Sequence, residues 1–276
     1  MVRSQRIADR RKPSNKLNVS MRLPLLSALT IAALLLSNCS GTKPAETKAP
    51  EPAAPVYFKV DPSTAGTLTG AIKFTGRKPA RKSVDMSNDP ACVEAHHGKP
   101  YDESEVVNPN GTLANVFVYV KTGLEGKRFP IPATPATIDQ KGCWFNPRVI
   151  GIQVGQTLSV VNSDPVTHNI HPMAQINREW NHSQGAGDEP LARKFTKPEI
   201  MIRVKCNIHS WMHAFIGVLD HPYYAVSNDT GSFTIPNLPP GDYTLEAWHE
   251  KLGTQEQKVT VSPSGKVTAD FTFKGE

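Results

Sequence analysis

Apolar and polar residues alternate along several short stretches of the chain, which is the pattern of half-buried β-strands. Residues 267–273 alternate strictly, and residues 232–235 and 243–247 repeat the pattern. Residues 115–121 form a continuous apolar run instead, which is typical of a strand buried on both faces. Further strands are expected near residues 67–75, 148–154, 156–162, 166–171, 199–206 and 213–219.

The intervals between these stretches indicate β-sandwiches rather than a helical fold. Turn signals occur at residues 228–231 (Asn-Asp-Thr-Gly) and 239–242 (Pro-Pro-Gly-Asp). One short helix is expected to open at Asp89-Pro90 and close at Gly98. The 24 prolines and 19 glycines also argue against a helical bundle. We therefore expect an all-β protein made of sandwich domains.

The N-terminal region has the features of an export signal. Residues 23–36 form an apolar run that is too short for a transmembrane helix but suits the core of a signal peptide. The following Leu36-Ser37-Asn38-Cys39 resembles a bacterial lipobox, in which cleavage precedes the cysteine and lipid is attached to its sulfur. This resemblance implies a signal peptide over residues 1–38, lipidation of Cys39, and a lipoprotein of the cell envelope, with the outer membrane favoured. An ordinary signal peptide cleaved nearby is the alternative.

Residues 39–57 contain little that a hydrophobic core could use. They are rich in Pro, Ala, Thr, Lys and Glu, and such a composition favours an extended tether over a folded segment.

The basic net charge does not indicate a nucleic-acid-binding protein. The formal net charge is +6. Residues 1–38 hold seven basic side chains and one acidic one, so the remainder balances 24 basic against 24 acidic residues. Without a basic patch we expect no nucleic-acid partner.

The chain has four cysteines. Cys39 is assigned to the lipobox, and Cys206 belongs to a motif described below. An exported protein enters an oxidising compartment, where thiols are commonly bonded or bound to metal. By parity alone, Cys92 and Cys143 are expected to form a disulfide, with two buried thiols as the alternative.

The candidate metal ligands include a Cys-x2-His-x2-Met motif, which consists of Cys206, His209 and Met212. Alternation along residues 199–206 places Cys206 in the core-facing row at the end of its strand. His168 lies on the inward face of another expected strand and supplies a second imidazole. A thiolate, two imidazoles and a weak thioether are the ligands of a blue-copper site. Zinc is the main chemical rival, but a thioether is a poor ligand for it.

The order of these residues resembles the cupredoxin family, especially amicyanin. A Gly-led strand that ends in Asn (155–162) precedes His168-Asn169, and the short Cys-His-Met loop follows. The resemblance covers about residues 144–219 and implies a Greek-key sandwich holding one type 1 copper. It also implies that Asn169 supports the Cys206 end of the site through hydrogen bonds.

The resemblance implies electron transfer. The protein would carry single electrons between redox proteins of the envelope, such as a cytochrome or a dehydrogenase, and would not be an enzyme. The ring edge of His209 would reach the surface beside an apolar patch of Ile208, Trp211 and Phe215, and electrons would leave there.

The sequence is also compatible with other functions. Copper binding or delivery without redox turnover is the main alternative, and a metal-free structural or carbohydrate-binding sandwich is another. A multicopper oxidase or nitrite reductase needs a second centre, commonly with His-x-His pairs, and the sequence has no such pair.

Residues 222–274 resemble a carboxypeptidase regulatory-like, or transthyretin-like, module. The resemblance rests on residues 223–233, on Asn237-Leu-Pro-Pro-Gly-Asp-Tyr243 and on the final alternating strand. It implies a second β-sandwich, whose usual first strand is similar to residues 66–74. We expect a cupredoxin-like domain over residues 58–220 and the module over residues 221–276. The alternatives are insertion of the first sandwich between that strand and the rest of the module, or one enlarged sandwich.

Overall fold

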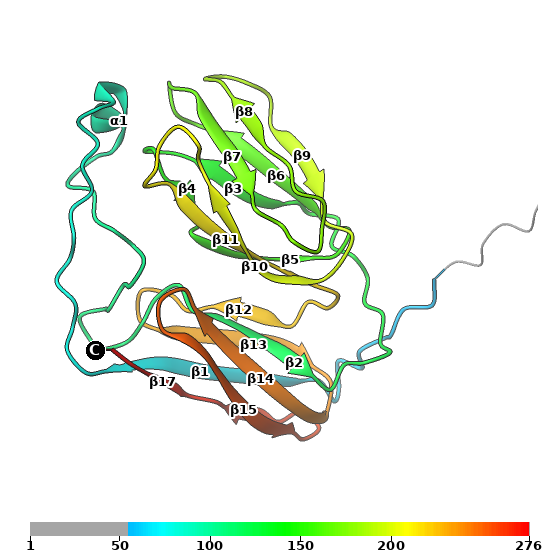
Figure 1. Ribbon diagram of the computed structural model, residues 1–276. Coiled ribbons are helices and arrows are strands. Elements are labelled where there is room, and N and C mark those ends of the chain that lie inside the picture. The colour runs from blue at the N-terminus through cyan, green and yellow to red at the C-terminus, as the bar shows by residue number, and fades with distance from the viewer. Residues whose placement is uncertain (1–54, 276) are drawn as a thin grey trace, which may run out of the picture. The chain divides into compact units, whose positions relative to one another are not determined.

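The computed structural model describes residues 55–275. The expected signal peptide, Cys39 and nearly all of the expected tether lie outside the described residues. Within them the chain has one short helix, α1 (Pro90–Ala95), and otherwise strands and loops (Figure 1). None of the helical structure in this part of the chain is long and apolar enough to cross a membrane. The expected all-β class is therefore confirmed.

Two sheets share one core and form what we call the site sandwich. The first sheet has the order β5 (Val149–Gln153), β11 (His213–Leu219), β10 (Glu199–Lys205), β7 (His168–Pro172) and β8 (His182–Gln184). The second has the order β4 (Phe145–Asn146), β3 (Ala136–Gln140), β6 (Thr157–Asn162) and β9 (Leu191–Lys194). Their inward side chains form one buried cluster that includes Ile138, Leu158, Val160, Ile170, Val204 and Ile216. Alternate residues of each strand face this core because successive side chains point to opposite faces.

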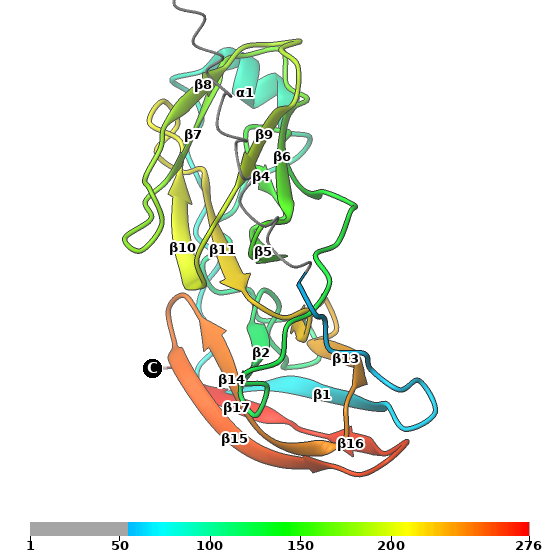
Figure 2. The ribbon, with the colours of Figure 1, turned by 90° about the vertical axis from the view of Figure 1, so that its right-hand side faces the viewer.

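Two further sheets form what we call the C-terminal sandwich (Figure 2). In one, β1 (Gly66–Thr75) pairs with β13 (Ser232–Leu238), β16 (Lys266–Thr268) and β17 (Phe271–Lys274). The other has the order β12 (Tyr224–Val226), β2 (Phe117–Thr122), β14 (Gly241–His249) and β15 (Gly253–Val261). Its core includes Leu68, Ile72, Val118, Ile235, Leu245 and Phe273.

The strand pairing divides the chain differently from the expected boundary at residue 220. Strands β1 and β2 pair with strands of the C-terminal sandwich, although the expected boundaries place them in the first domain. All strands of the site sandwich lie between β2 and β12 in the sequence. The pairing therefore favours insertion of the site sandwich into the C-terminal one. Alternation shows which residues face a core, but it does not show which sheet a strand joins.

Two glycines in register allow aromatic side chains to lie against the site sandwich. Gly151 of β5 and Gly217 of β11 are paired neighbours. A Cβ on Gly151 would lie 2.1 Å from the ring of Tyr224, and one on Gly217 would lie 2.6 Å from the ring of Phe117. These two rings stack with their centroids 5.6 Å apart. Only glycine leaves room for this contact, which joins β5 and β11 to β2 and β12.

A buried ion pair makes a further contact between the two sandwiches, since Arg148 lies just before β5 and Glu250 just after β14. Nε of Arg148 donates to Oε1 of Glu250 at 2.6 Å, and the second guanidinium nitrogen Nη2 donates to Oε2 at 3.0 Å. Both side chains are largely buried, so this bidentate pair is shielded from water and ions.

Local details of three strands differ from the alternation pattern. The C-terminal stretch is two strands, because Asp270 turns aside and accepts a hydrogen bond from the backbone of Ala71. Strand β15 was not expected, because both of its faces are polar over residues 253–258. In β10 a bulge at Met201, with φ of 57°, turns Ile200 outward and leaves it 37% exposed. The expected core-facing row therefore begins at Ile202.

Candidate metal site

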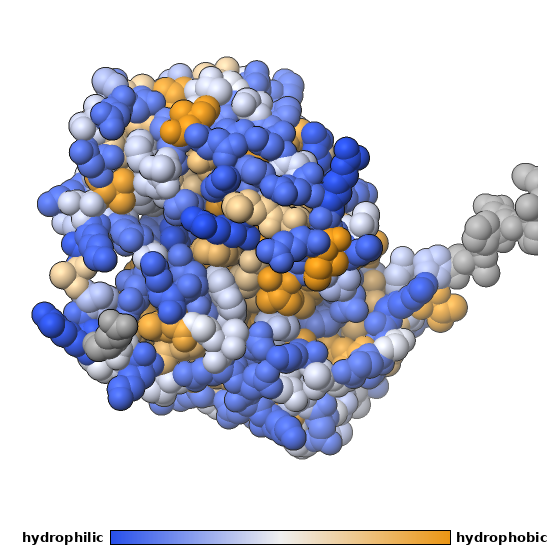
Figure 3. Space-filling view, in the orientation of Figure 1, coloured by the Kyte–Doolittle hydropathy of each residue, from blue (hydrophilic) through white to orange (hydrophobic). Residues whose placement is uncertain are grey.

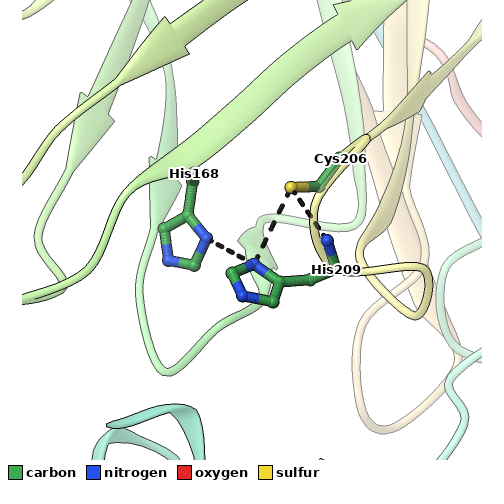
Figure 4. Close-up of side chains that lie close together, drawn as sticks. All are labelled: His168, Cys206 and His209. Atoms are coloured by element: carbon green, nitrogen blue, oxygen red, sulfur yellow. Dashed lines mark hydrogen bonds between the residues drawn. The ribbon is translucent and has the colours of Figure 1, made fainter. Parts of the chain in front are cut away.

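The structure brings together three of the four expected metal ligands at one end of the site sandwich (Figure 4). His168 begins β7, Cys206 follows β10, and His209 lies on the loop between β10 and β11. A ligand atom from each lies within 4.8 Å of the others. Their side chains are buried: His168 is 0%, Cys206 3% and His209 3% exposed.

A tight loop folds His209 back toward the thiol. The backbone N–H of Met212 donates to the carbonyl of His209 at 3.0 Å, and that of Cys206 donates to the carbonyl of Met212 at 3.2 Å. These bonds close the loop across the ends of β10 and β11. The Met212 side chain is 1% exposed and belongs to the same buried cluster as Cys206.

Backbone N–H groups surround the sulfur of Cys206. Those of Asn169 and His209 each donate to Sγ at 3.4 Å. Burial alone would raise the pKa of the thiol, but hydrogen bonds from His168 and from the backbone outweigh it and lower the pKa to about 7. The site therefore stabilises a thiolate, which is the form that binds metal.

Asn169 ties the two ligand-bearing segments together. Its Oδ1 accepts from the backbone N–H of Asn207 at 3.1 Å. Its Nδ2 donates to the carbonyl of His182 at 3.0 Å and to Oδ1 of Asn181. The residue thus joins the Cys206 loop to β7 and β8, in the supporting position that the family resemblance implies.

The two imidazoles turn the same nitrogen inward. Nδ1 of His168 lies 3.0 Å from Nδ1 of His209, and Nδ1 of His209 lies 3.8 Å from Sγ of Cys206. The opposite nitrogens donate to carboxylates. Nε2 of His168 contacts Oδ2 of Asp164 at 2.8 Å, and Nε2 of His209 contacts Oδ2 of Asp89 at 3.0 Å.

These hydrogen bonds affect the ionisation of both partners. Burial alone would lower the pKa of His168, but its bonds to Asp164 and Cys206 outweigh burial and raise it. Burial alone would raise the pKa of Asp164, yet bonds from His168 and from two backbone N–H groups lower it. The hydrogen bond from His209 lowers the pKa of Asp89. Both carboxyl groups are therefore ionised near neutral pH.

Asp89 and Asp164 are site residues that sequence reasoning missed. Asp89 was expected only at the start of a helix, and Asp164 was not singled out. Asp89 and His209 are 120 residues apart in the chain, so no local pattern connects them.

The start of α1 and a disulfide cover His209. Cys92 of α1 and Cys143 are joined by a disulfide, as expected for the two cysteines outside the lipobox and the metal motif. Sγ of Cys92 lies 3.6 Å from Nε2 of His209. The ring of Trp211 packs on that of His209 with centroids 5.2 Å apart, and its Nε1 donates to the carbonyl of Cys143 at 3.1 Å.

This cover contradicts the expectation that the edge of His209 reaches the surface. His209 is buried beneath Asp89 and Cys92. The expected apolar patch does not form either, because Phe215 is buried against Trp248 and only Ile208 is well exposed. The face shown in Figure 3 is mostly hydrophilic, with apolar side chains in small separate groups.

His171 takes no part in the site. Its ring contacts Oε1 of Glu179 and Oδ1 of Asn207 instead. Its neighbour His168, three residues earlier, faces the core.

The donor set fits a copper ion. Both inward nitrogens are turned toward one another and toward the thiol, and both outward nitrogens are already bound to carboxylates. A buried thiolate with two imidazoles suits copper, and Met212 belongs to the same buried cluster as the thiol.

Comparison with known proteins gives a family match for part of the chain. Residues 214–274 match the family model of the carboxypeptidase regulatory-like domain. They comprise β11 of the site sandwich and β12 to β17 of the C-terminal sandwich. No curated protein matches the chain.

Several solved structures of copper proteins are similar to part of the chain. A Cu-containing nitrite reductase from Thermus scotoductus SA-01 is 27% identical over 37% of this chain, with a TM-score of 0.30. The match covers 25% of that enzyme, so the chain spans about a quarter of its length. An oxidized amicyanin variant is 16% identical over 37% of this chain and 97% of its own, with a TM-score of 0.27. A purple cupredoxin from Nitrosopumilus maritimus is 22% identical over 30% of this chain and 98% of its own, with a TM-score of 0.26.

Proposed function

We propose that His168, Cys206, His209 and Met212 hold one copper ion in a type 1 site, and that the protein carries single electrons. The observation that carries this proposal is the convergence of a thiol and two Nδ1 atoms within 4.8 Å in a buried position. When bound, copper supplies one-electron chemistry by changing between Cu(I) and Cu(II).

The chain's own residues contribute a fixed set of donors. Two backbone N–H groups hold the sulfur of Cys206, and a carboxylate holds each imidazole from behind. Ligands that are held from outside move little when the charge at the centre changes. Such a site suits both oxidation states and makes electron exchange fast.

Burial favours a resident metal over copper delivery. A delivery site needs an exposed ion that a partner can remove, whereas the three facing ligands here are at most 3% exposed. The same cover limits access to small molecules, so we propose that the protein is not an enzyme. Its partners would be redox proteins of the cell envelope, such as a cytochrome or a dehydrogenase.

The spectrum of the purified protein loaded with Cu(II) tests this function. We expect an intense absorption band toward the red end of the visible range, together with narrow copper hyperfine splitting in the EPR spectrum. Stoichiometric copper without that band would refute a type 1 site. Binding of Zn(II) in preference to Cu(II) would point to a structural zinc site instead.

We also propose that lipid on Cys39 anchors the protein on the periplasmic side of a bacterial membrane. Replacing Cys39 with serine should move the protein from the membrane fraction to the soluble fraction, because the lipid is attached to the cysteine sulfur. Fractionation followed by mass spectrometry of the N-terminal peptide measures this. A wild-type protein that carries no lipid would contradict the anchor and leave the copper proposal untouched.

A further inference from the structure

Two carboxylates contact the metal site from outside the ligand set. Asp164 accepts from Nε2 of His168 at 2.8 Å, and Asp89 accepts from Nε2 of His209 at 3.0 Å. The two contacts are similar in kind, although Asp164 precedes β7 and Asp89 precedes α1. Each imidazole that faces the centre is therefore held by one carboxylate behind it.

Each carboxylate is itself held in place by backbone groups. Asp164 accepts from the N–H groups of Gly142 and Cys143, both at 2.7 Å. Oδ1 of Asp89 caps α1 by accepting from the N–H groups of Ala91 at 3.1 Å and Cys92 at 3.2 Å.

The disulfide connects these two supports. Cys92 and Cys143 each supply one of the N–H groups, and their sulfurs are bonded to each other. The carboxylates are thus fixed parts of the framework rather than mobile surface groups.

This arrangement determines which ring nitrogen carries the proton. An ionised carboxylate only accepts hydrogen bonds, so the nitrogen that faces it must carry N–H. A neutral imidazole with its proton on Nε2 has its lone pair on Nδ1. In both rings Nδ1 is the atom that points to the centre.

The carboxylates also place negative charge behind the ligands. Asp164 is 4% and Asp89 31% exposed in their side chains. The buried charge of Asp164 is weakly screened, whereas the charge of the partly exposed Asp89 is screened more by water and ions. Both charges favour the metal state of higher positive charge, and a carboxylate behind a ligating histidine makes that histidine more basic.

We infer that Asp89 and Asp164 are positioning residues that hold His209 and His168 with Nδ1 free for the metal and favour Cu(II) over Cu(I). This inference rests on the proposed copper function. The reduction potential of the site is therefore lower than it would be without the carboxylates. The more deeply buried Asp164 has the larger influence.

Asp89→Asn is the sharpest test, because asparagine caps helices as well as aspartate does. Its oxygen can still accept from Ala91 and Cys92, while its NH2 group then faces Nε2 of His209 and removes the acceptor. The matched control is Asp85→Asn in the same loop, where the exposed Asp85 accepts only from Ser87.

For copper-loaded protein we expect Asp89→Asn to weaken the preference for Cu(II) over Cu(I) by about tenfold, which raises the potential by about 60 mV. Asp85→Asn should leave the potential unchanged, and Asp164→Asn should raise it further than Asp89→Asn. An unchanged potential in Asp89→Asn, with the type 1 spectrum retained, would overturn the inference.

A second measurement does not depend on copper. Two-bond 1H–15N NMR of the metal-free protein at mildly alkaline pH should show His209 as the single tautomer protonated on Nε2. In Asp89→Asn this tautomer should no longer dominate, while Asp85→Asn should match the wild type. A wild-type His209 protonated on Nδ1 would overturn the inference. Failure of the wild type to show a type 1 spectrum would refute the proposed function alone, since NMR still decides the positioning role.

Discussion

Replacing Cys206 with serine should abolish the intense visible band of the copper-loaded protein. The band requires a short bond between copper and a thiolate, and a serine hydroxyl neither ionises near neutral pH nor provides a soft donor. Removing a direct ligand should also weaken copper binding by more than the ~10–100-fold typical of losing a supporting residue. Absorption and EPR spectra, with a copper titration by calorimetry, measure both effects.

The matched control for this variant is His171→Gln. His171 lies three residues beyond His168 but contacts Glu179 and Asn207 instead of the site. This variant should keep the band and the copper affinity of the wild type. If Cys206→Ser kept the band, the copper would be bound elsewhere and the proposed function would fail.

Removing the disulfide should cause a large loss of stability. Cys92 and Cys143 are separated by 51 residues, and closing a loop of that length in the unfolded chain corresponds to about 4 kcal/mol. The double variant Cys92→Ser/Cys143→Ser should therefore unfold at a clearly lower urea concentration. Urea unfolding followed by circular dichroism measures the difference in the free energy of unfolding.

The same variant should loosen the cover over His209, because α1 is then held mainly by Asp89 and by local contacts. Hydrogen exchange at the backbone N–H groups of positions 92 and 93 should become faster than in the wild type. Reducing the wild type with a dithiol should reproduce both effects. An unchanged urea midpoint in the double variant would show that the disulfide contributes little to the folded state.

The sequence was sufficient to predict the part of the site that depends on short spacings. Cys206, His209 and Met212 are close in the chain, and strand alternation placed Cys206 and His168 on inward faces. Asp89 could not be assigned to the site, because its contact with His209 spans 120 residues and depends on how α1 docks. The burial of His209 was missed for the same reason.

The strands were predictable where one face is buried and the other is polar. Residues 67–75 and 232–235 were both expected as strands from their apolar positions. Their partners were not predictable, because pairing between strands far apart in the sequence leaves no local signal. Strand β10 shows a further limit, since the bulge at Met201 changes which side Ile200 faces.

The place of β1 in its sheet has a consequence for biosynthesis. This strand lies between partners that come from the last part of the chain, and its backbone contact with Asp270 spans 199 residues. A ribosome makes the N-terminal end first, so β1 must wait for almost the whole chain before its partners exist. The strands of the site sandwich are contiguous in sequence and can associate earlier. An unpaired apolar strand is prone to aggregate, so β1 is a vulnerable segment of the nascent chain, whereas the strands around the metal-ligand loop can pair first.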